Sequence, residues 1–385
     1  MKRHSQIGLL MNFRHAYELR MCEAFASVAL AREWELSLFS PDDVVRGAAK
    51  ADGYIARGID AATTAALKAM GKPVVSIYSN NFETGFSTVD SDHAAAGRLA
   101  AEHFLDHRFT NFAFCGYEGT PFSDWRRDAF TQRLAQNNFS CNHYPTPKNA
   151  LSTFSMNLMK GEWFRMGSDY RQMLAWVRHL PKPVAVFCSN DLRAYQLACT
   201  CRNAGIKVPH EVAILGVDND LIVCSFSSPM LSSVDTDVFS IGRTAAESLA
   251  RMLESPGAEP SHIVVPPKGV VVRPSSEVYP LNPPWLSEAL VFISRNIGKN
   301  LNSADVARHL GMSHTPIDKA FRSVLRTSVQ KEIVRARLEM SARLLITTKL
   351  PVGEVARRAG FTRTEYFCSC FRNKFGVKPS EYRRS

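Results

Sequence analysis

Short apolar runs alternate with longer helical patterns through residues 5–275. Residues 7–11 precede an amphipathic stretch at 16–32, and apolar runs at 184–188 and 212–217 flank another at 191–204. Short runs separated by helix-length patterns are typical of buried strands joined by crossover helices. The pattern therefore predicts an α/β fold with parallel sheets, in a segment long enough to form two lobes.

After the prolines at 280–284 the pattern becomes purely helical, and it repeats. Residues 306–313 (VARHLGMS) recur as 355–362 (VARRAGFT), with Gly311 and Gly360 at the same place. Each copy predicts a helix, a turn that uses the positive φ open to glycine, and a second helix capped by Ser313 or Thr362. With a further helical pattern at 329–348 between the copies, the segment predicts an all-α domain with a duplicated helix-turn-helix.

Charge separates the two segments as sharply as periodicity does. The 385-residue chain carries a net charge of +11, and from residue 284 onward we count 19 Lys and Arg against 8 Asp and Glu. All of the excess positive charge therefore lies in the helical segment, and the α/β segment is neutral. A basic module joined to a neutral one indicates a nucleic-acid reader attached to a domain with another task.

The helical segment also carries a family signature. It contains Gly-Phe at 360–361, Phe-x-x-x-Phe-Gly at 371–376 and Pro-x-x-Tyr-Arg at 379–383. These motifs resemble those of AraC/XylS-type transcription regulators. The resemblance implies two DNA-binding heads held at a fixed separation by the helix at 329–348.

Four pieces of the α/β segment resemble another family. Residues 92–104, 126–130, 189–194 and 214–219 are similar, in this order, to the effector domains of LacI/GalR-type regulators, although His93 replaces an Asn and Ala129 a Gly. The resemblance implies the two-lobed fold of periplasmic sugar-binding proteins. A sensor of this type followed by an AraC-type reader implies a small neutral sugar, a xylose-like pentose, bound between the lobes.

Candidate ligand-binding residues follow from sugar chemistry combined with this resemblance. A neutral sugar needs donors and acceptors for its hydroxyls. Asp218, at a strand end, is expected to accept from two hydroxyls, and Arg126 to donate from the opposite lobe; the alternatives are a turn cap and a surface charge. Asn190 is expected to face the ligand, whereas Asp191 caps the next helix. Three weaker candidates, two of them equally suited to packing or capping, are Asn12, Tyr17 and Asp92.

Candidate DNA-binding residues lie on the second helix of each motif, at positions placed by the family resemblance. Lys319 can donate to guanine, Glu365 can accept from cytosine, and Thr315 or Thr364 can touch a thymine methyl group. Arg322 and Arg372 occupy equivalent repeat positions and are expected to bind phosphates, unless they are solvated surface arginines. The first head offers His314, Thr315, Asp318, Lys319 and Arg322; the second offers Arg363, Thr364, Glu365, Cys368, Ser369 and Arg372.

The sequence argues against several other classes of protein. It has no Gly-x-Gly-x-x-Gly, Gly-Lys-Ser/Thr, Gly-x-Ser-x-Gly or His-Glu-x-x-His motif, so no catalytic residues, cofactor or metal are expected. Nine cysteines without metal-like spacing are expected to be reduced cytoplasmic thiols. No apolar run predicts a signal peptide or a membrane anchor.

These observations lead to one hypothesis with two alternatives. We expect an effector domain at 1–279, a linker at 280–285 and a DNA-binding domain at 286–385. The chain is expected to be a sugar-controlled transcription regulator, more specifically an activator, that acts as a homodimer on double-stranded promoter DNA and contacts RNA polymerase. The alternatives are a sugar- or nucleoside-processing enzyme with a DNA-binding tail, and a constitutive DNA binder whose front domain only dimerises.

Overall fold

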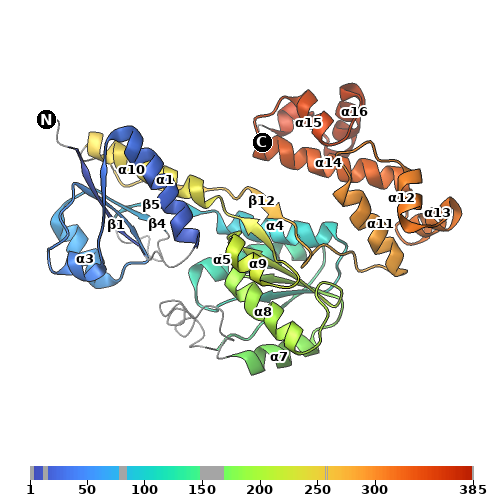
Figure 1. The fold of residues 1–385 in the computed structure, drawn as a ribbon, viewed down its shortest axis with the longest axis horizontal. Coiled ribbons are helices and arrows are strands. Elements are labelled where there is room, and N and C mark those ends of the chain that lie inside the picture. The colour runs from blue at the N-terminus through green and yellow to red at the C-terminus, as the bar shows by residue number, and fades with distance from the viewer. Residues whose placement is uncertain are drawn as a thin grey trace. The chain divides into compact units, whose positions relative to one another are not determined.

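The computed structural model describes residues 4–11, 16–77, 85–147, 169–255, 257 and 259–383. They form two compact units (Figure 1). The first is α/β and consists of Met1–His103 and Thr110–Ser276, and the second is helical and consists of Phe104–Phe109 and Glu277–Ser385. The first helix of the helical segment begins at Pro284, inside the linker expected at 280–285.

The first lobe of the α/β unit is built on a sheet with strand order β11-β5-β4-β3-β1-β2. Every pairing described in this sheet is parallel, as the alternating pattern predicts. The strands are β1 (Gln6–Leu10), β2 (Glu35–Leu38), β3 (Gly53–Arg57), β4 (Val74–Ile77), β5 (Ser87–Ser91) and β11 (His262–Val265), and the helices are α1 (Ala16–Arg32), α2 (Pro41–Val45), α3 (Ala61–Met70) and α10 (Val238–Glu254).

The second lobe has a sheet of order β12-β10-β9-β8-β6-β7. Its pairings are parallel except at one edge, where β12 runs antiparallel to β10 because the chain returns there from the first sheet in the opposite direction. The strands are β6 (Phe112–Cys115), β7 (Cys141–His143), β8 (Val184–Cys188), β9 (Val212–Val217), β10 (Ser232–Asp235) and β12 (Gly269–Val271), and the helices are α4 (His93–Asp106), α5 (Pro121–Ala135), α7 (Tyr170–His179), α8 (Asp191–Asn203) and α9 (Leu221–Phe226).

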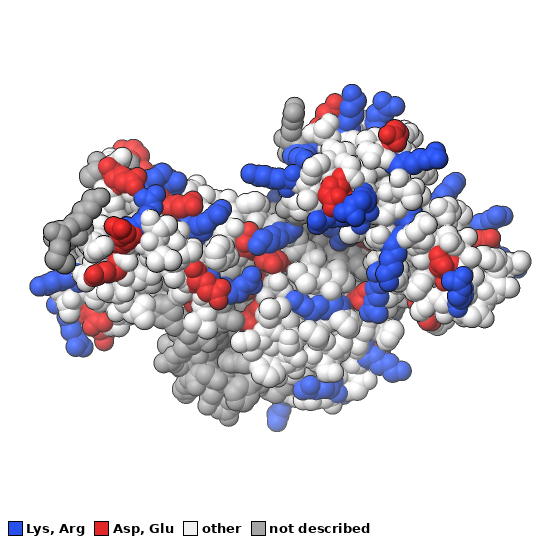
Figure 2. Space-filling view, turned by 45° about the horizontal axis from the view of Figure 1, so that its top comes forward, with Lys and Arg blue, Asp and Glu red and all other residues white. Residues whose placement is uncertain are grey.

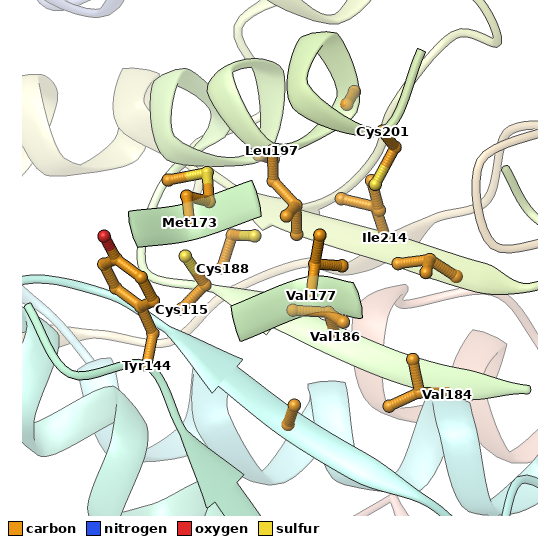
Figure 3. Packing of buried hydrophobic residues seen from close by; sticks show 14 of the residues in the cluster. Cys115, Tyr144, Met173, Val177, Val184, Val186, Cys188, Leu197, Cys201 and Ile214 are labelled. Atoms are coloured by element: carbon orange, nitrogen blue, oxygen red, sulfur yellow. The ribbon is translucent and has the colours of Figure 1, made fainter. Parts of the chain in front are cut away.

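The core of the second lobe explains why its strands are almost wholly apolar. Val186 from β8, Ile214 from β9 and Leu197 from α8 are fully buried in one cluster (Figure 3). Burial of such a side chain contributes about 1.5–3 kcal/mol. Because helices cover the sheet, the strands need no polar face, and the ends of β6, β8 and β9 are held firmly enough to position the residues that follow them.

The helical unit has one small core for each predicted helix-turn-helix. In the first core α12 and α13 pack on α11, and in the second α15 and α16 pack with α17. The long helix α14 contributes Val329 and Ile333 to the first core, and Leu338 and Leu345 to the second. The helices are α11 (Pro284–Arg295), α12 (Ser303–Leu310), α13 (His314–Ser323), α14 (Val329–Thr347), α15 (Val352–Arg358), α16 (Thr364–Phe375) and α17 (Pro379–Tyr382).

The two glycines of the repeat, Gly311 and Gly360, have different structural roles. Both have positive φ, 63° at Gly311 and 84° at Gly360. A Cβ atom at Gly311 would meet nothing within 4 Å, whereas one at Gly360 would lie 2.2 Å from the carbonyl oxygen of Ile297. Gly360 therefore allows the second head to contact the segment that follows α11, which the repeat alone does not predict.

Arg337 of α14 bonds the same segment, next to Gly360. Its side chain is only 8% exposed and donates to the carbonyl oxygens of Lys299, at 3.0 Å, and Leu301, at 3.3 Å. A guanidinium that donates to several backbone carbonyls in a buried position fixes their relative placement. The two heads are thus held together by α14 and by this arginine.

Candidate functional site

Two sequence-predicted ligand residues meet at the carboxyl ends of β8 and β9. Arg126 of α5 places Nη2 3.4 Å from Asp218 Oδ1, and its Nη1 donates to the carbonyl oxygen of Ser189. Arg126 is 3% exposed, and its Nε has no hydrogen-bond partner among the residues that the structure describes. The pair presents a carboxylate acceptor and guanidinium donors side by side.

The prediction that Arg126 reaches Asp218 from the opposite lobe is wrong. Arg126 bonds Ser189, directly after β8, and Asp218 follows β9 of the same sheet. The chain passes from the first sheet to the second before β6, and α5 connects β6 to β7 of the second sheet. Arg126 and Asp218 therefore belong to the same lobe. Lobe membership depends on this crossing, which the local pattern of apolar residues does not reveal.

The backbone at Asp218 is held in an unusual conformation. Asp218 has φ 104° and Asn219 has φ 51°, in the region that side chains other than glycine rarely adopt. Several bonds hold this turn: Asn219 Nδ2 donates to Asp235 Oδ2 at 3.1 Å, and Arg273 Nη2 donates to Asn219 Oδ1 at 2.6 Å. Such strain persists only where surrounding contacts fix it, and it is concentrated at functional sites.

Burial changes the titration of Asp218. Loss of solvent raises the pKa of its carboxyl to about 6, and the guanidinium groups of Arg126 and Arg57 oppose that rise. The carboxyl is therefore ionised at neutral pH and able to accept hydrogen bonds. It becomes protonated as pH falls through 6.

The first lobe faces Asp218 with an aromatic and an arginine. Burial, followed by the nearby Asp218 carboxylate, raises the pKa of Tyr17, so its hydroxyl stays protonated and can donate. The Arg57 guanidinium lies 4.9 Å from the centre of the Tyr17 ring and forms an ion pair with the buried Glu18. Tyr17 is thus beside the Asp218 pair, and its hydroxyl offers a further polar group.

The capping role expected for Asp191 belongs to Asn190 instead. Asn190 is the N-cap of α8, and its Oδ1 accepts from the Arg193 N–H at 2.8 Å. Asp191 is buried and accepts from the Asp220 N–H at 2.8 Å and from the Ser233 hydroxyl at 2.6 Å. Asp191 therefore supports the turn that carries Asp218. Both residue types cap helices well, so the sequence could not separate them.

The weaker candidates have different outcomes. Asp92 caps α4, because its Oδ1 accepts from the Ala95 N–H at 2.7 Å, which was the alternative reading of that residue. Asn12 lies outside the described residues.

An aromatic pair beside Arg126 was missed by the sequence reasoning. The His93 ring stacks on Trp125 with ring centres 5.6 Å apart, and His93 Nε2 lies 3.3 Å from Asp90 Oδ1. Burial lowers the pKa of His93, and Arg126 lowers it further. The signal was present, because Trp125 directly precedes Arg126 and an aromatic face is what the C–H surface of a sugar requires.

On the first head the predicted residues share one face. His314, Thr315, Lys319 and Arg322 are exposed and, with Asp318, line an open surface concavity. The opposite face of α13 is buried through Ile317, Ala320 and Phe321. Ser313 occupies the predicted N-cap position, but its side chain makes no capping hydrogen bond.

The second head repeats this arrangement. Phe367 and Phe371 of α16 are buried, whereas the candidate residues are exposed apart from the half-buried Cys368. The N-cap is Arg363, not the predicted Thr362, because the turn in this copy is longer. The exposed candidates are Arg363, Thr364, Glu365, Ser369 and Arg372.

Charge on the surface follows the division seen in the sequence. Figure 2 shows Lys and Arg side chains outnumbering Asp and Glu on the visible face of the helical unit, whereas the two kinds are interspersed on the first lobe. A surface of this kind attracts the phosphate backbone of nucleic acids.

Fold and site together define a class of protein: a two-lobed sensor joined to a double helix-turn-helix reader. A family model described as "Periplasmic binding protein-like domain" matches residues 101–276, and one described as "Helix-turn-helix domain" matches residues 306–385. No helix in the described part of the chain is long and apolar enough to cross a membrane. No group of three or more His, Cys, Asp or Glu in that part could hold a metal ion.

The chain is homologous over nearly its whole length to xylose operon regulatory proteins. It is 26% identical to the xylose operon regulatory protein of Escherichia coli strain K12, over 99% of this chain and 97% of the relative. It is 24% identical to the protein of the same name from Haemophilus influenzae, over 99% of each chain. With this ancestry and two helix-turn-helix motifs, the chain is a DNA-binding transcription regulator and not an enzyme.

Solved structures share the fold. The structure of xylose-binding transcription activator xylR matches with a TM-score of 0.62 at 24% identity, over 100% of this chain and 98% of that one. A LacI family transcriptional regulator from Enterococcus faecium with bound ribose matches with a TM-score of 0.58 at 21% identity, over 72% of this chain and 100% of that one.

Proposed function

We propose that the chain binds a small neutral sugar, a pentose of the xylose type, beside Arg126 and Asp218, and that the bound sugar changes how its two heads engage promoter DNA. The observation that carries this proposal is the Arg126–Asp218 pair with Tyr17 beside it. Carboxylate, guanidinium and phenol groups offer acceptors and donors to adjacent hydroxyls. The names of the full-length relatives support a xylose-type effector.

The charges of the cleft favour a neutral ligand over an anionic one. Arg126 is paired with Asp218, and Arg57 is paired with Glu18, so neither guanidinium is available to neutralise a phosphate or a carboxylate without losing its partner. A second carboxylate, Asp90, lies beside His93. A phosphorylated sugar or a sugar acid would meet repulsion here that a neutral pentose avoids.

We propose further that the regulator is an activator, that it acts in the cytoplasm as a homodimer, and that it contacts RNA polymerase. The two heads of one chain are held rigidly by α14, so they can cover one half-site without changing their spacing. We therefore propose that the sugar changes the spacing between the heads of two chains, because the sensor domains of a dimer can set the distance between half-sites.

Calorimetric titration of the full-length protein with D-xylose tests the sugar assignment. We expect saturable binding, and at a hundred times Kd the sugar should add about 2.7 kcal/mol to the free energy of unfolding. D-ribose, D-glucose and xylose 5-phosphate serve as comparison ligands. Arg126→Ala should abolish binding, whereas Arg127→Ala, the adjacent arginine paired with Asp124 and Asp128, should not. Absence of D-xylose binding by the wild-type protein would contradict this assignment.

Substitutions on the two recognition helices should affect different parts of one DNA site. The heads are expected to enter successive major-groove turns about 10 base pairs apart. Lys319→Ala and Glu365→Ala should each relax base preference in a separate segment, at a cost of about 1–3 kcal/mol. Arg322→Ala should instead weaken all sequences similarly, as expected for a phosphate contact. Base-substitution profiles would refute the two-headed arrangement if both changes altered the same base pair.

A further inference from the structure

One helix takes part in both compact units. α4 begins at His93 and ends at Asp106, and its first eleven residues belong to the α/β unit. Its last turn and the following residues, Phe104–Phe109, belong to the helical unit that carries the two heads. A helix is a rigid element, so a displacement at one end of α4 is carried to the other.

The start of α4 is in backbone contact with the helix that carries Arg126. Gly97 lies so close to α5 that a Cβ atom there would be 2.4 Å from the carbonyl oxygen of Arg126 and 3.0 Å from Ala129 Cβ. His93, at the first turn of α4, is close enough to Arg126 for its pKa to be lowered by that guanidinium, after the larger effect of burial. The turn of α5 that carries Arg126 cannot move towards α4 without displacing it, because no space separates the two helices at Gly97.

The end of α4 is seated against the first turn of α14. Arg108 places Nη2 3.5 Å from Glu332 Oε2, and Glu332 is only 1% exposed. Glu332 Oε1 also accepts from Arg335 Nε at 2.8 Å, so the carboxylate is shared between two guanidiniums. Beside this pair the His107 ring stacks on Tyr279, with ring centres 4.8 Å apart.

α14 is the element from which both heads would respond. Its first turns are packed in the core of the first head and its later turns in the core of the second. Arg337, in the middle of α14, bonds the segment between α11 and α12. A shift of α14 at Glu332 would therefore displace side chains in the cores of both heads.

We propose that α4 transmits the state of the effector cleft to α14, and that the Arg108–Glu332 contact is where the signal enters the helical unit. This inference rests on the proposed function in one respect, since it takes a sugar at Arg126 as the source of the displacement. The bound sugar moves Arg126, α5 presses on Gly97, and the last turn of α4 shifts the first turn of α14.

The test compares Arg108→Ala with Arg133→Ala in the full-length protein. Arg133 is a matched control, because it is an arginine of α5 that pairs with Glu102 of α4 at 3.4 Å, outside the contact with α14. Three quantities are measured: the Kd for D-xylose, the Kd for a duplex selected by the wild-type protein from a random library, and the ratio of duplex Kd values with and without D-xylose.

We expect the ratio to lie in the range of about 5- to 150-fold in the wild-type protein and in Arg133→Ala, which is usual for coupled sites. In Arg108→Ala it should fall to about 2-fold or less, while D-xylose still binds with nearly its normal affinity. Glu332→Gln should reduce the ratio too, and the double variant should lose little beyond either single one, because the two residues act through one contact. A wild-type ratio in Arg108→Ala would overturn the proposal.

A second measurement separates this proposal from the proposed function. If the wild-type protein fails to bind D-xylose, the sugar assignment is wrong. The Arg108–Glu332 contact is then tested by amide hydrogen exchange of the protein with and without the selected duplex. Duplex binding should raise the protection of amides in Phe104–Phe109 in the wild-type protein and in Arg133→Ala, but not in Arg108→Ala. Unchanged protection of this segment in the wild-type protein would overturn the role of α4.

Discussion

The affinity of the full-length protein for duplex DNA should fall by about 10³-fold or more between 50 and 200 mM salt. A drop of that size is expected when six to ten phosphates are contacted, because each contact releases condensed counterions. The helical segment supplies the positive charge for this, since 19 Lys and Arg stand against 8 Asp and Glu from residue 284 onward. Fluorescence anisotropy at a series of salt concentrations measures the slope.

Single substitutions locate the phosphate contacts. Arg322→Ala and Arg372→Ala should each reduce the slope of log affinity against log salt by about 1. Arg46→Ala is the matched control, because Arg46 is an exposed arginine at the end of α2 whose carboxylate partner, Asp42, is also exposed. An equal change of slope in Arg46→Ala would contradict the assignment of DNA binding to the helical unit.

The elements of the fold could be predicted because they depend on local periodicity. Every residue of the apolar run 212–217 is buried, and the repeat containing Gly311 and Gly360 has the spacing of a helix, a turn and a helix. The membership of each lobe could not be predicted in this way. The chain passes from one sheet to the other and back, so α5 and β9 share a lobe although many residues separate them.

The sequence predicted which residues gather at the candidate site better than it predicted the role of each residue there. Asp218 and Arg126 do lie together, because Asp218 directly follows β9 and Arg126 lies on α5, a helix of the same lobe. Asp191 does not cap α8 because its carboxylate accepts from one N–H and one hydroxyl that belong to residues 29 and 42 positions later. Adjacent residues with similar capping chemistry are distinguished only by such distant partners.

Arg337 illustrates a different kind of omission. In the sequence it is one arginine among many in a basic segment, and nothing marks it as buried. In the structure it bonds backbone carbonyls from the segment after α11, next to the close approach of Gly360 to Ile297. The separation of the two heads is thus set by packing between the repeats, and a comparison of the repeats with each other cannot show it.

Replacing Asp218 with Asn should abolish the response to D-xylose at concentrations that saturate the wild-type protein. The loss of a charged acceptor that pairs with sugar hydroxyls should cost about 2–3 kcal/mol, or roughly 30- to 150-fold in Kd. Asn keeps the shape of the side chain and tolerates the positive φ at this position, so the turn should persist. Affinity for duplex DNA without sugar should be nearly unchanged. Asp128→Asn, on the exposed side of α5, is the matched control.

The pH dependence of sugar binding tests the same carboxyl by its charge. Its pKa in the free protein is raised to about 6, chiefly by burial, so the accepting form predominates above that value and is lost as pH falls through it. The affinity of the wild-type protein for D-xylose should therefore be level from pH 7 to 8 and about tenfold weaker at pH 5, one unit below the pKa. Asp218→Asn cannot titrate and should show a weak but level affinity over this range. Calorimetric Kd values from pH 5 to 8 measure both, and a wild-type affinity that did not change below pH 6 would show that the sugar does not depend on ionised Asp218.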